Sequence, residues 1–307
     1  MRFLAIGECM AELAPTATPD EFRLGFAGDT FNTAWYLARC APQIDVGFLT
    51  VVGNDAISAK MRNEMRGGGI SDACVDTHPA KTIGLYLISL EDGERSFAYW
   101  RGQSAARTLA DDPASLAEKL ADADFLYFSG ITLAILPADR REGFLHALAT
   151  ARKAGKTIAF DPNLRPKLWA STEEMTQSIM DGAAVSDLVL PSFEDEAHWF
   201  ADADPDATAQ RYLDAGAITV VVKNGADPVH YAEAERRGSY PISPIRQLVD
   251  TTAAGDSFNA GIFARHGAGD SLEQGIAYAC ALSGQVVQGR GALVPVDVDS
   301  LMKLGTS

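Results

Sequence analysis

Short apolar runs alternate with longer stretches of mixed polar and apolar residues along most of the chain. A run of about four to eight apolar residues between turn residues is typical of a buried strand, and a longer mixed stretch is typical of a helix. We predict strands at residues 3–7, 45–53, 124–129, 156–161, 187–191 and 218–223. We predict helices that end near residues 39 and 66, and further helices at residues 139–153, 172–182, 206–215 and 271–287. This repeated order predicts an α/β fold with a central, mostly parallel sheet covered by helices on both faces.

One pair of predicted strands interrupts this order. Residues 82–90 and 95–101 are rich in residues that favour strands, and Asp92 and Gly93 lie between them. An Asp-Gly pair between two such runs favours a tight hairpin turn. Because the hairpin is inserted into a series of strands and helices, we expect it to form a lid.

Composition limits the kinds of partner that the chain can have. The 307 residues include 26 Lys and Arg against 41 Asp and Glu, which gives a formal net charge of −15. This charge repels nucleic acid and acidic membrane surfaces, so we expect neither as a partner. No apolar stretch is long enough for a signal sequence or a membrane span, which predicts a cytoplasmic protein. The four cysteines show no Cys-x-x-Cys spacing, so we expect reduced, buried thiols at Cys9, Cys40, Cys74 and Cys280.

Several common catalytic and nucleotide-binding motifs are absent from the sequence. There is no Gly-x-x-x-x-Gly-Lys-Ser/Thr sequence and no Gly-x-Gly-x-x-Gly after the first strand, so a P-loop or a dinucleotide-binding site loses its main support. The sequence also lacks His-Glu-x-x-His and Gly-x-Ser-x-Gly, and its five histidines show no metal-ligand spacing.

The sequence of residues 249–261 carries the strongest chemical signal. Three small residues, Ala253, Ala254 and Gly255, precede Asp256 where a helix is expected to begin. The first amides of a helix have no intrahelical acceptor and can hold phosphate oxygens, while the small side chains leave room for that approach. Asp256 could then accept a proton from a substrate hydroxyl that attacks phosphorus. The alternative is an ordinary helix with an acidic residue in its first turn.

Other polar residues follow the predicted strands. They occupy residues 161–165, 192–196 and 223–225. In a parallel sheet, ligands gather at the carboxyl ends of the strands, so this placement supports a site there. In the hairpin, strand alternation places Tyr99 and Arg101 on one face, where a guanidinium and a phenol could grip a carboxylate. The alternative is a surface strand with an arginine and an aromatic residue packed beneath it.

The stretch Asp-Thr-Thr-Ala-Ala-Gly-Asp at residues 250–256 resembles the second signature of the PfkB, or ribokinase-like, family of sugar kinases. Ala253 stands where that family usually has Gly. The sequence around Gly28, Asp29 and Asn32 resembles the first signature, and both stretches are most similar to the keto-deoxygluconate kinase branch. The resemblance covers nearly the whole chain and implies a ribokinase-like fold, in which Asp256 is the catalytic base and the amides of Ala253, Ala254 and Gly255 form an anion hole.

The resemblance also implies roles for residues elsewhere in the chain. It implies one ribokinase-like domain with a small β-sheet lid from about residues 10–27 and 82–104, which often forms a dimer contact. The implied sugar-acid contacts are Gly28, Asp29, Asn32, Tyr86, Tyr99, Arg101, Arg165 and Asp256. Arg165 could instead meet the nucleotide phosphates. The implied nucleotide contacts are Ser192, Lys223, Gly225, Ala254, Gly255, Ala279 and Ser283, although core packing explains the last two equally well.

Two cation sites follow from the same resemblance. The family motif Asn-x-x-Glu is associated with Mg²⁺ bound with the ATP phosphates, but here Ser and Asp replace Asn and Glu, so Glu194, Asp195 and Glu196 are not ranked. In relatives, a monovalent cation such as K⁺ binds near the positions of Asp250, Thr252 and Gly291, where a plain glycine turn is the alternative.

The function that these observations predict is an ATP-dependent kinase that phosphorylates the terminal hydroxyl of 2-dehydro-3-deoxy-D-gluconate. One alternative keeps the chemistry and changes the acceptor to a neutral ketose such as fructose. A second alternative is a non-catalytic sugar-acid sensor, although the intact Gly255-Asp256 pair argues against it.

Overall fold

The computed structural model describes residues 1–307 except 19, 92–93, 234–235 and 303–307. Its main sheet has nine strands in the order β13-β12-β11-β10-β9-β8-β1-β4-β5. All neighbouring strands pair in parallel except β11 with β12 and β12 with β13. The strands are β1 (Arg2–Ile6), β4 (Asp45–Gly53), β5 (Val75–His78), β8 (Phe125–Ser129), β9 (Thr157–Asp161), β10 (Leu188–Val189), β11 (Thr219–Val222), β12 (Val229–Glu233) and β13 (Arg236–Tyr240).

Both faces of this sheet are buried. In β1, Phe3 and Ala5 belong to one apolar core, whereas Leu4 and Ile6 belong to the other. Successive side chains of a strand point to opposite faces, so a strand covered on both sides has apolar residues at every position. This is why the buried strands could be recognised in the sequence as continuous apolar runs.

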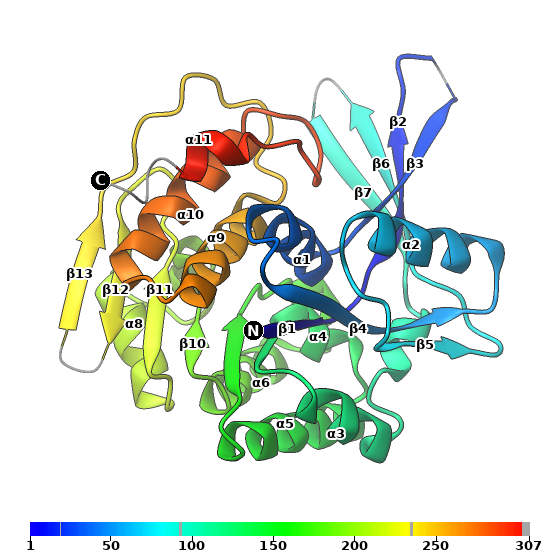
Figure 1. Cartoon of the computed structure of the whole chain (residues 1–307), viewed down its shortest axis with the longest axis horizontal. Coiled ribbons are helices and arrows are strands. Elements are labelled where there is room, and N and C mark those ends of the chain that lie inside the picture. The colour runs from blue at the N-terminus through cyan, green and yellow to red at the C-terminus, as the bar shows by residue number, and fades with distance from the viewer. Residues whose placement is uncertain (19, 92–93, 234–235, 303–307) are drawn as a thin grey trace.

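The helices divide between the two faces, as Figure 1 shows. The core that contains Phe3 is covered by α1 (Asp29–Cys40), α2 (Ala56–Gly67), α9 (Ala254–Ala268), α10 (Leu272–Val286) and α11 (Val298–Met302). The core that contains Leu4 is covered by α3 (Pro113–Ala121), α4 (Gly130–Ile135), α5 (Ala138–Lys153), α6 (Thr172–Ala184), α7 (Phe193–Trp199) and α8 (Pro205–Asp214), with short 3-10 helices at Ala105–Thr108 and Pro166–Leu168.

A separate four-stranded sheet rises at one side of the molecule (Figure 1). Its order is β3-β2-β6-β7, formed by β2 (Met10–Pro15), β3 (Phe22–Ala27), β6 (Leu85–Glu91) and β7 (Glu94–Trp100). Two antiparallel hairpins meet through a parallel pairing between β2 and β6. This sheet confirms the expected small second sheet, and we call it the lid sheet; its action as a lid stays a prediction. The Asp92-Gly93 turn lies outside the described residues.

The remaining sequence-based expectations about the fold are mostly confirmed. The sheet is mostly parallel, and the helix before Gly67 and the strand at Asp45–Gly53 lie where they were expected. β10 is shorter than expected, and β5, β12 and β13 were missed. Cys9, Cys40 and Cys74 are buried free thiols, while Cys280 is only partly buried. Among the described helices, none has the length and apolarity needed to cross a membrane.

Candidate active site

Asp256 lies in the first turn of α9, at the centre of the candidate site. The Nδ2 atom of Asn32 donates a hydrogen bond of 2.8 Å to its carboxylate, and the hydroxyl of Thr33 donates to its main-chain carbonyl at 3.1 Å. Burial and the nearby negative charge of Asp29 raise the pKa of Asp256 to about 8. The residue still keeps some contact with solvent. It can therefore exist in both protonation states near neutral pH, as a general base requires.

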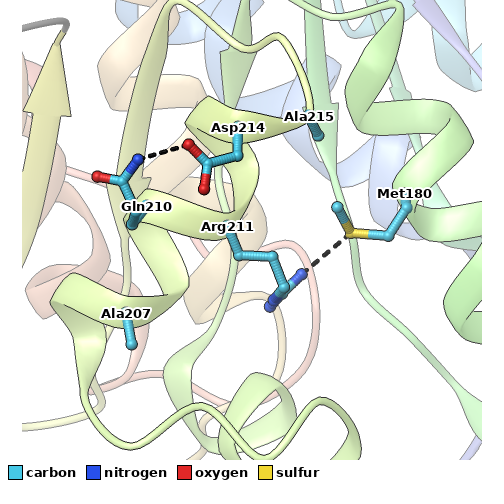
Figure 2. A pocket seen from close by; sticks show the side chains of 6 residues that line it. All are labelled: Met180, Ala207, Gln210, Arg211, Asp214 and Ala215. Atoms are coloured by element: carbon cyan, nitrogen blue, oxygen red, sulfur yellow. Dashed lines mark hydrogen bonds between the residues drawn. The ribbon is translucent and has the colours of Figure 1, made fainter.

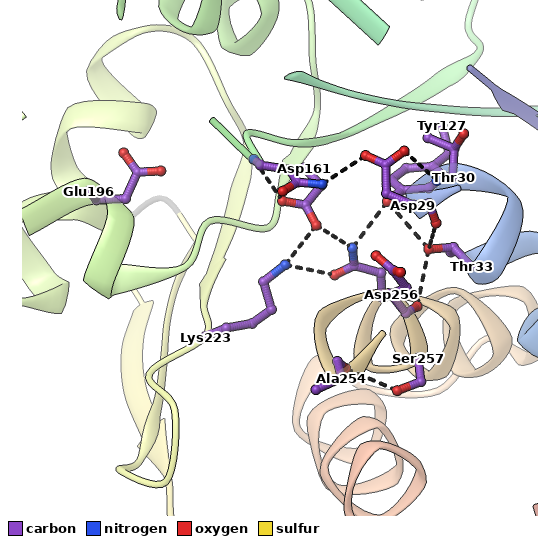
Figure 3. A network of polar contacts seen from close by, with 12 residues as sticks. Asp29, Thr30, Thr33, Tyr127, Asp161, Glu196, Lys223, Ala254, Asp256 and Ser257 are labelled. Atoms are coloured by element: carbon purple, nitrogen blue, oxygen red, sulfur yellow. Dashed lines mark hydrogen bonds and ion pairs between the residues drawn. The ribbon is translucent and has the colours of Figure 1, made fainter. Parts of the chain in front are cut away.

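A network of buried polar groups adjoins Asp256, as Figure 3 shows. The ammonium group of Lys223 forms an ion pair of 2.8 Å with Asp161 and donates to Asn259 at 3.3 Å. The Nδ2 atom of Asn259 donates to the same carboxylate oxygen of Asp161 at 2.7 Å and to the hydroxyl of Tyr127 at 3.1 Å. A Cβ atom at Gly255 would lie 3.5 Å from the Lys223 ammonium. The network thus holds a positive charge beside the start of α9.

The start of α9 has a strained residue and exposed donors. Ala253 has a φ of 60°, in the left-handed region that favours glycine. The amide of Ala254 donates to the carbonyl of Thr251 at 3.1 Å. Within the described part of the chain, the amides of Ala253, Gly255 and Asp256 have no hydrogen-bond acceptor. These three donors at the positive end of a helix fit an anion such as phosphate.

The turn before α1 supports the site from the other side. Gly28 lies so close to the chain at Glu8 that a Cβ atom would be 2.1 Å from the Glu8 carbonyl oxygen. The carboxylate of Asp29 accepts a hydrogen bond of 2.8 Å from the side chain of Asn163. Asn32 accepts from the amide of Gly28 at 3.3 Å and donates to Asp256. Asn32 therefore orients the candidate base.

The inner face of the lid sheet lies against the same region. Met10, Ala27, Tyr86 and Ile88 pack with Ala292, and Ala253 borders this cluster. The lid sheet therefore contacts the turn that leads into α9. This contact places lid side chains next to the candidate site.

Tyr99 lies within β7, and Arg101 directly follows the end of that strand. Tyr99 is 53% exposed, and its ring centroid lies 5.8 Å from that of Tyr86. Tyr86 donates a short hydrogen bond to the carboxylate of Glu12. The guanidinium of Arg101 is largely buried and forms an ion pair with Glu8. The buried ion pair is compatible both with a carboxylate contact and with the alternative of a surface strand with a packed arginine, so the clamp stays a prediction.

The structure separates the three acidic residues that the sequence left unranked. Burial raises the pKa of Asp195, and Arg165, Asp161 and Lys223 are among the charges that act on it. Asp195 therefore lies within electrostatic reach of the network described above. Glu196 is completely buried and accepts hydrogen bonds from Arg211 and Tyr212, on the side of α7 that packs on α8. The carboxylate of Glu196 is thus engaged by Arg211 and Tyr212.

A comparison with known protein families identifies the chain. The profile of the pfkB family carbohydrate kinases matches residues 2–299. The chain belongs to this family.

This pfkB chain is similar to named sugar kinases in sequence and in fold. It is 37% identical over 306 residues to the 2-dehydro-3-deoxygluconokinase of Escherichia coli, covering 96% of this chain and 97% of that protein. It is 35% identical over 300 residues to the 2-dehydro-3-deoxygluconokinase of Dickeya dadantii, covering 95% and 96%. The fold matches the crystal structure of a fructokinase with bound ATP from Xylella fastidiosa, with a TM-score of 0.85, 23% identity and coverage of 99% and 97%. The ribokinase-like fold predicted from the sequence is thus confirmed.

The nucleotide contacts implied by the family resemblance differ in their surroundings. Ser192 and Lys223 form a parallel bridge, and the amide of Phe193 donates to the carbonyl of Lys223 at 2.8 Å. Gly225 has a φ of 60°, which suits its turn. Ala279 is fully buried against Gly261 and is a core residue in this pfkB chain, as the packing alternative proposed. Ser283 is partly exposed and donates to the carbonyl of Cys280 at 3.2 Å.

The residues implied for a monovalent cation do come together. One carboxylate oxygen of Asp250 accepts hydrogen bonds from the amide and the hydroxyl of Thr252, at 3.1 and 2.7 Å. The other oxygen accepts from the amide of Gly291 at 2.7 Å. Asp250 therefore ties the turn before α9 to the turn after α10. No cluster of three or more His, Cys, Asp or Glu side chains suited to a metal ion occurs among the described residues.

A depression of about 550 Å³ lies elsewhere on the pfkB chain, between α6 and α8 (Figure 2). Its lining includes Arg211, whose guanidinium contacts the sulfur of Met180 at 3.1 Å. Arg211 is also held by ion pairs with Glu196 and Asp202. The lining is thus engaged in internal contacts, and none of its residues belongs to the Asp256 network.

Sequence reasoning missed several members of the Asp256 network. Asn259 follows Asp256 by three positions on α9, a spacing that places both on one helix face. Asp161 and Asn163 follow β9 and were noted as polar residues after a strand, but they received no role. Tyr127 lies in a predicted strand and Thr33 in a predicted helix, and no motif around either residue indicated a role in a site. Helix spacing from Asp256 could have found Asn259.

Proposed function

We propose that this pfkB chain is an ATP-dependent kinase that transfers a phosphoryl group to the terminal hydroxyl of 2-dehydro-3-deoxy-D-gluconate. The observation that carries the proposal is the position of Asp256, whose pKa is raised to about 8 in the first turn of α9, beside unpartnered amides. Proton acceptor and anion site are thereby adjacent. This is the arrangement that phosphoryl transfer to an alcohol needs.

The choice of acceptor is supported by two observations. The relatives from Escherichia coli and Dickeya dadantii are named for 2-dehydro-3-deoxygluconate. In addition, the exposed ring of Tyr99, within β7, and the guanidinium of Arg101, just after β7, are candidate partners for a carboxylate. An arginine is well suited to a carboxylate, which this acid has and fructose lacks. Gly28, Asp29 and the exposed Arg165 are further candidate contacts.

The chain's own residues have separate tasks in the proposed reaction. Ionised Asp256 takes the proton of the substrate hydroxyl, and Asn32 holds the carboxylate in place. The amides of Ala253, Gly255 and Asp256 stabilise negative charge that develops on the transferred group, and Lys223 adds a positive charge beside them. When bound, ATP would supply the phosphoryl group. The family fold and these N–H donors are suited to binding its phosphates.

Cations and partners complete the proposal. Asp195 is the acid best placed to position Mg²⁺ through water, and a K⁺ ion near Asp250, Thr252 and Gly291 would support the turn before α9. We expect the enzyme to act in the cytoplasm, where ATP is available, without nucleic acid or membrane partners. Exposed aromatic residues on the lid sheet, Phe22, Phe97 and Trp100, favour a homodimer through the lid.

The test is ADP release by the purified chain with Mg²⁺ and ATP. Four acceptors are compared: 2-dehydro-3-deoxygluconate, its galactonate epimer, fructose and ribose. We expect kcat/KM to be higher by about two orders of magnitude or more for the keto-deoxy acids. Preference for fructose would overturn the acceptor and keep Asp256 as base, while a lack of turnover with all four would overturn the kinase assignment for these acceptors.

A further inference from the structure

All four connections between the two sheets pass close to Glu8. Glu8 lies between β1 and β2, and its carbonyl contacts Gly28, which joins β3 to α1. A Cβ atom at Gly84, just before β6, would lie 2.8 Å from the Glu8 carboxylate and 3.2 Å from the Cβ of Arg101, which follows β7. The absence of side chains at Gly28 and Gly84 is what allows these segments to approach one another. We call this meeting point the lid hinge.

At the lid hinge, Glu8 and Arg101 form a buried ion pair. Their side chains are 1% and 11% exposed, and Nη2 of Arg101 faces Oε2 of Glu8. Among the described residues, neither Oε1 of Glu8 nor Nε of Arg101 has a hydrogen-bond partner. A buried ion pair with unsatisfied atoms stabilises a fold poorly, because the loss of hydration exceeds much of the attraction. A contribution to folding stability alone therefore explains the presence of this ion pair poorly.

We propose that Glu8 is a positioning residue, which fixes the guanidinium of Arg101 so that its remaining N–H groups meet the carboxylate of the sugar acid. This inference rests on the proposed function. An arginine side chain loses much rotamer freedom when it binds a ligand, and an internal partner removes that loss in advance. Because Glu8 lies at the lid hinge, the same contact fixes Arg101 relative to both sheets.

The experiment compares Glu8→Ala, Glu8→Gln and Arg101→Met with the unchanged enzyme. KM and kcat are measured for 2-dehydro-3-deoxygluconate and for 3-deoxyfructose, in which a hydroxymethyl group replaces the carboxylate. We expect Glu8→Ala to raise KM for the acid about tenfold or more while KM for 3-deoxyfructose changes less than about threefold. Glu8→Gln keeps an oxygen that accepts from Nη2, so it should restore KM for the acid to within about threefold of the original.

A double variant and a matched control complete the design. In an Arg101→Met background, Glu8→Ala should cause no further change in KM for the acid, because the residue that it positions is gone. Glu196→Gln alters another buried Glu–Arg pair, remote from the lid hinge, and should leave the ratio of the two KM values unchanged. Melting temperatures of all variants report any loss of folding.

Each outcome has one meaning. If Arg101→Met lowers the preference for the acid but Glu8→Ala raises both KM values equally, Glu8 has only a structural role and the inference is wrong. If Arg101→Met leaves the preference unchanged, the carboxylate contact in the proposed function is wrong, and the inference falls with it. Should Glu8→Ala fail to fold, Glu8→Asp decides: the shorter side chain should raise KM for the acid alone, and a parallel rise for both acceptors would overturn the inference.

Discussion

Asp256 and Glu196 are two acids with raised pKa values in very different surroundings. The pKa is about 8 for Asp256 and about 7 for Glu196, and burial is the largest cause in both. Glu196 is completely enclosed and accepts hydrogen bonds from Arg211 and Tyr212. Asp256 accepts from the Asn32 side chain and keeps some contact with solvent. A raised pKa therefore does not by itself mark a reactive acid, because reactivity also needs access and free acceptor capacity.

Among the substitutions that test this comparison, Asp256→Asn should have the largest effect. Asparagine keeps the size of the side chain but cannot accept the substrate proton, so kcat should fall by about three orders of magnitude or more. KM should change little, because the oxygen of the new amide can still accept the hydrogen bond from Asn32. Steady-state kinetics with 2-dehydro-3-deoxygluconate would measure this. Turnover near the original rate would remove Asp256 from its role.

Glu196→Ala should give the opposite result. Removing the carboxylate leaves the buried hydroxyl of Tyr212 without its acceptor and leaves Arg211 paired with Asp202 alone, which should cost about 1–3 kcal/mol of unfolding free energy. At 25 °C the folded variant should keep its turnover rate. Urea unfolding and kinetics on the same sample separate the two effects. A fall in kcat of tenfold or more, without unfolding, would show that Glu196 does serve the active site.

The pH dependence should also distinguish the two acids. Because the pKa of Asp256 is about 8, its ionised fraction falls about tenfold for each pH unit below that value, and kcat/KM should fall in parallel. Glu196→Ala should leave this profile unchanged. If kcat/KM stays constant between about pH 6 and 8, the range just below the raised pKa, Asp256 does not titrate as a base there.

The same raised pKa values predict how stability changes with pH. Between about pH 4 and 8, folded Asp256 retains a proton that the unfolded chain releases, so its contribution to stability decreases as the pH rises. Asp256→Asn should remove this contribution and become more stable, relative to the original chain, at pH 8 than at pH 5. Urea midpoints at the two pH values measure the difference. An equal difference at both values would contradict the raised pKa.

The smallest expected effects come from two strained alanines. Ala253, before α9, and Ala201, after α7, have φ values of 60° and 58°. Glycine removes the Cβ clash but makes the unfolded chain more flexible, so each change to Gly should stabilise by about 0.5–1 kcal/mol. Thermal unfolding measures both. Ala201→Gly should leave kcat unchanged, so a change in kcat for Ala253→Gly alone would link the strain to the site.

The strands that the sequence predicted well are those buried on both faces. In β4, residues 46–53 are apolar, small or neutral, and this run stands out from its surroundings. The edge strand β13 contains Arg236, and its neighbour β12 contains His230 and Glu233, so both lack a continuous apolar run; β12 pairs with β11, and β13 pairs with β12. Periodicity finds a strand only where burial on a face imposes a pattern.

The candidate site shows a similar division. Asp256 could be found because its chemistry is concentrated in a few consecutive residues, but Asn259 and Lys223 meet Asp161 across 98 and 62 positions of the chain. Such contacts depend on the order of strands in the sheet, which no local pattern contains. Likewise, strand alternation placed Tyr99 and Arg101 on one face without showing that Glu8 lies against Arg101.

The parallel pairing of β2 with β6 also determines when the lid sheet can form during synthesis. Ala11 pairs with Leu85, so the first hairpin leaves the ribosome long before its partner strand has been made. Until then, one edge of β2 has unpaired amides and carbonyls, which invite contact with other chains. Newly made chains should therefore be most prone to aggregation, and most dependent on chaperones, before the second hairpin emerges.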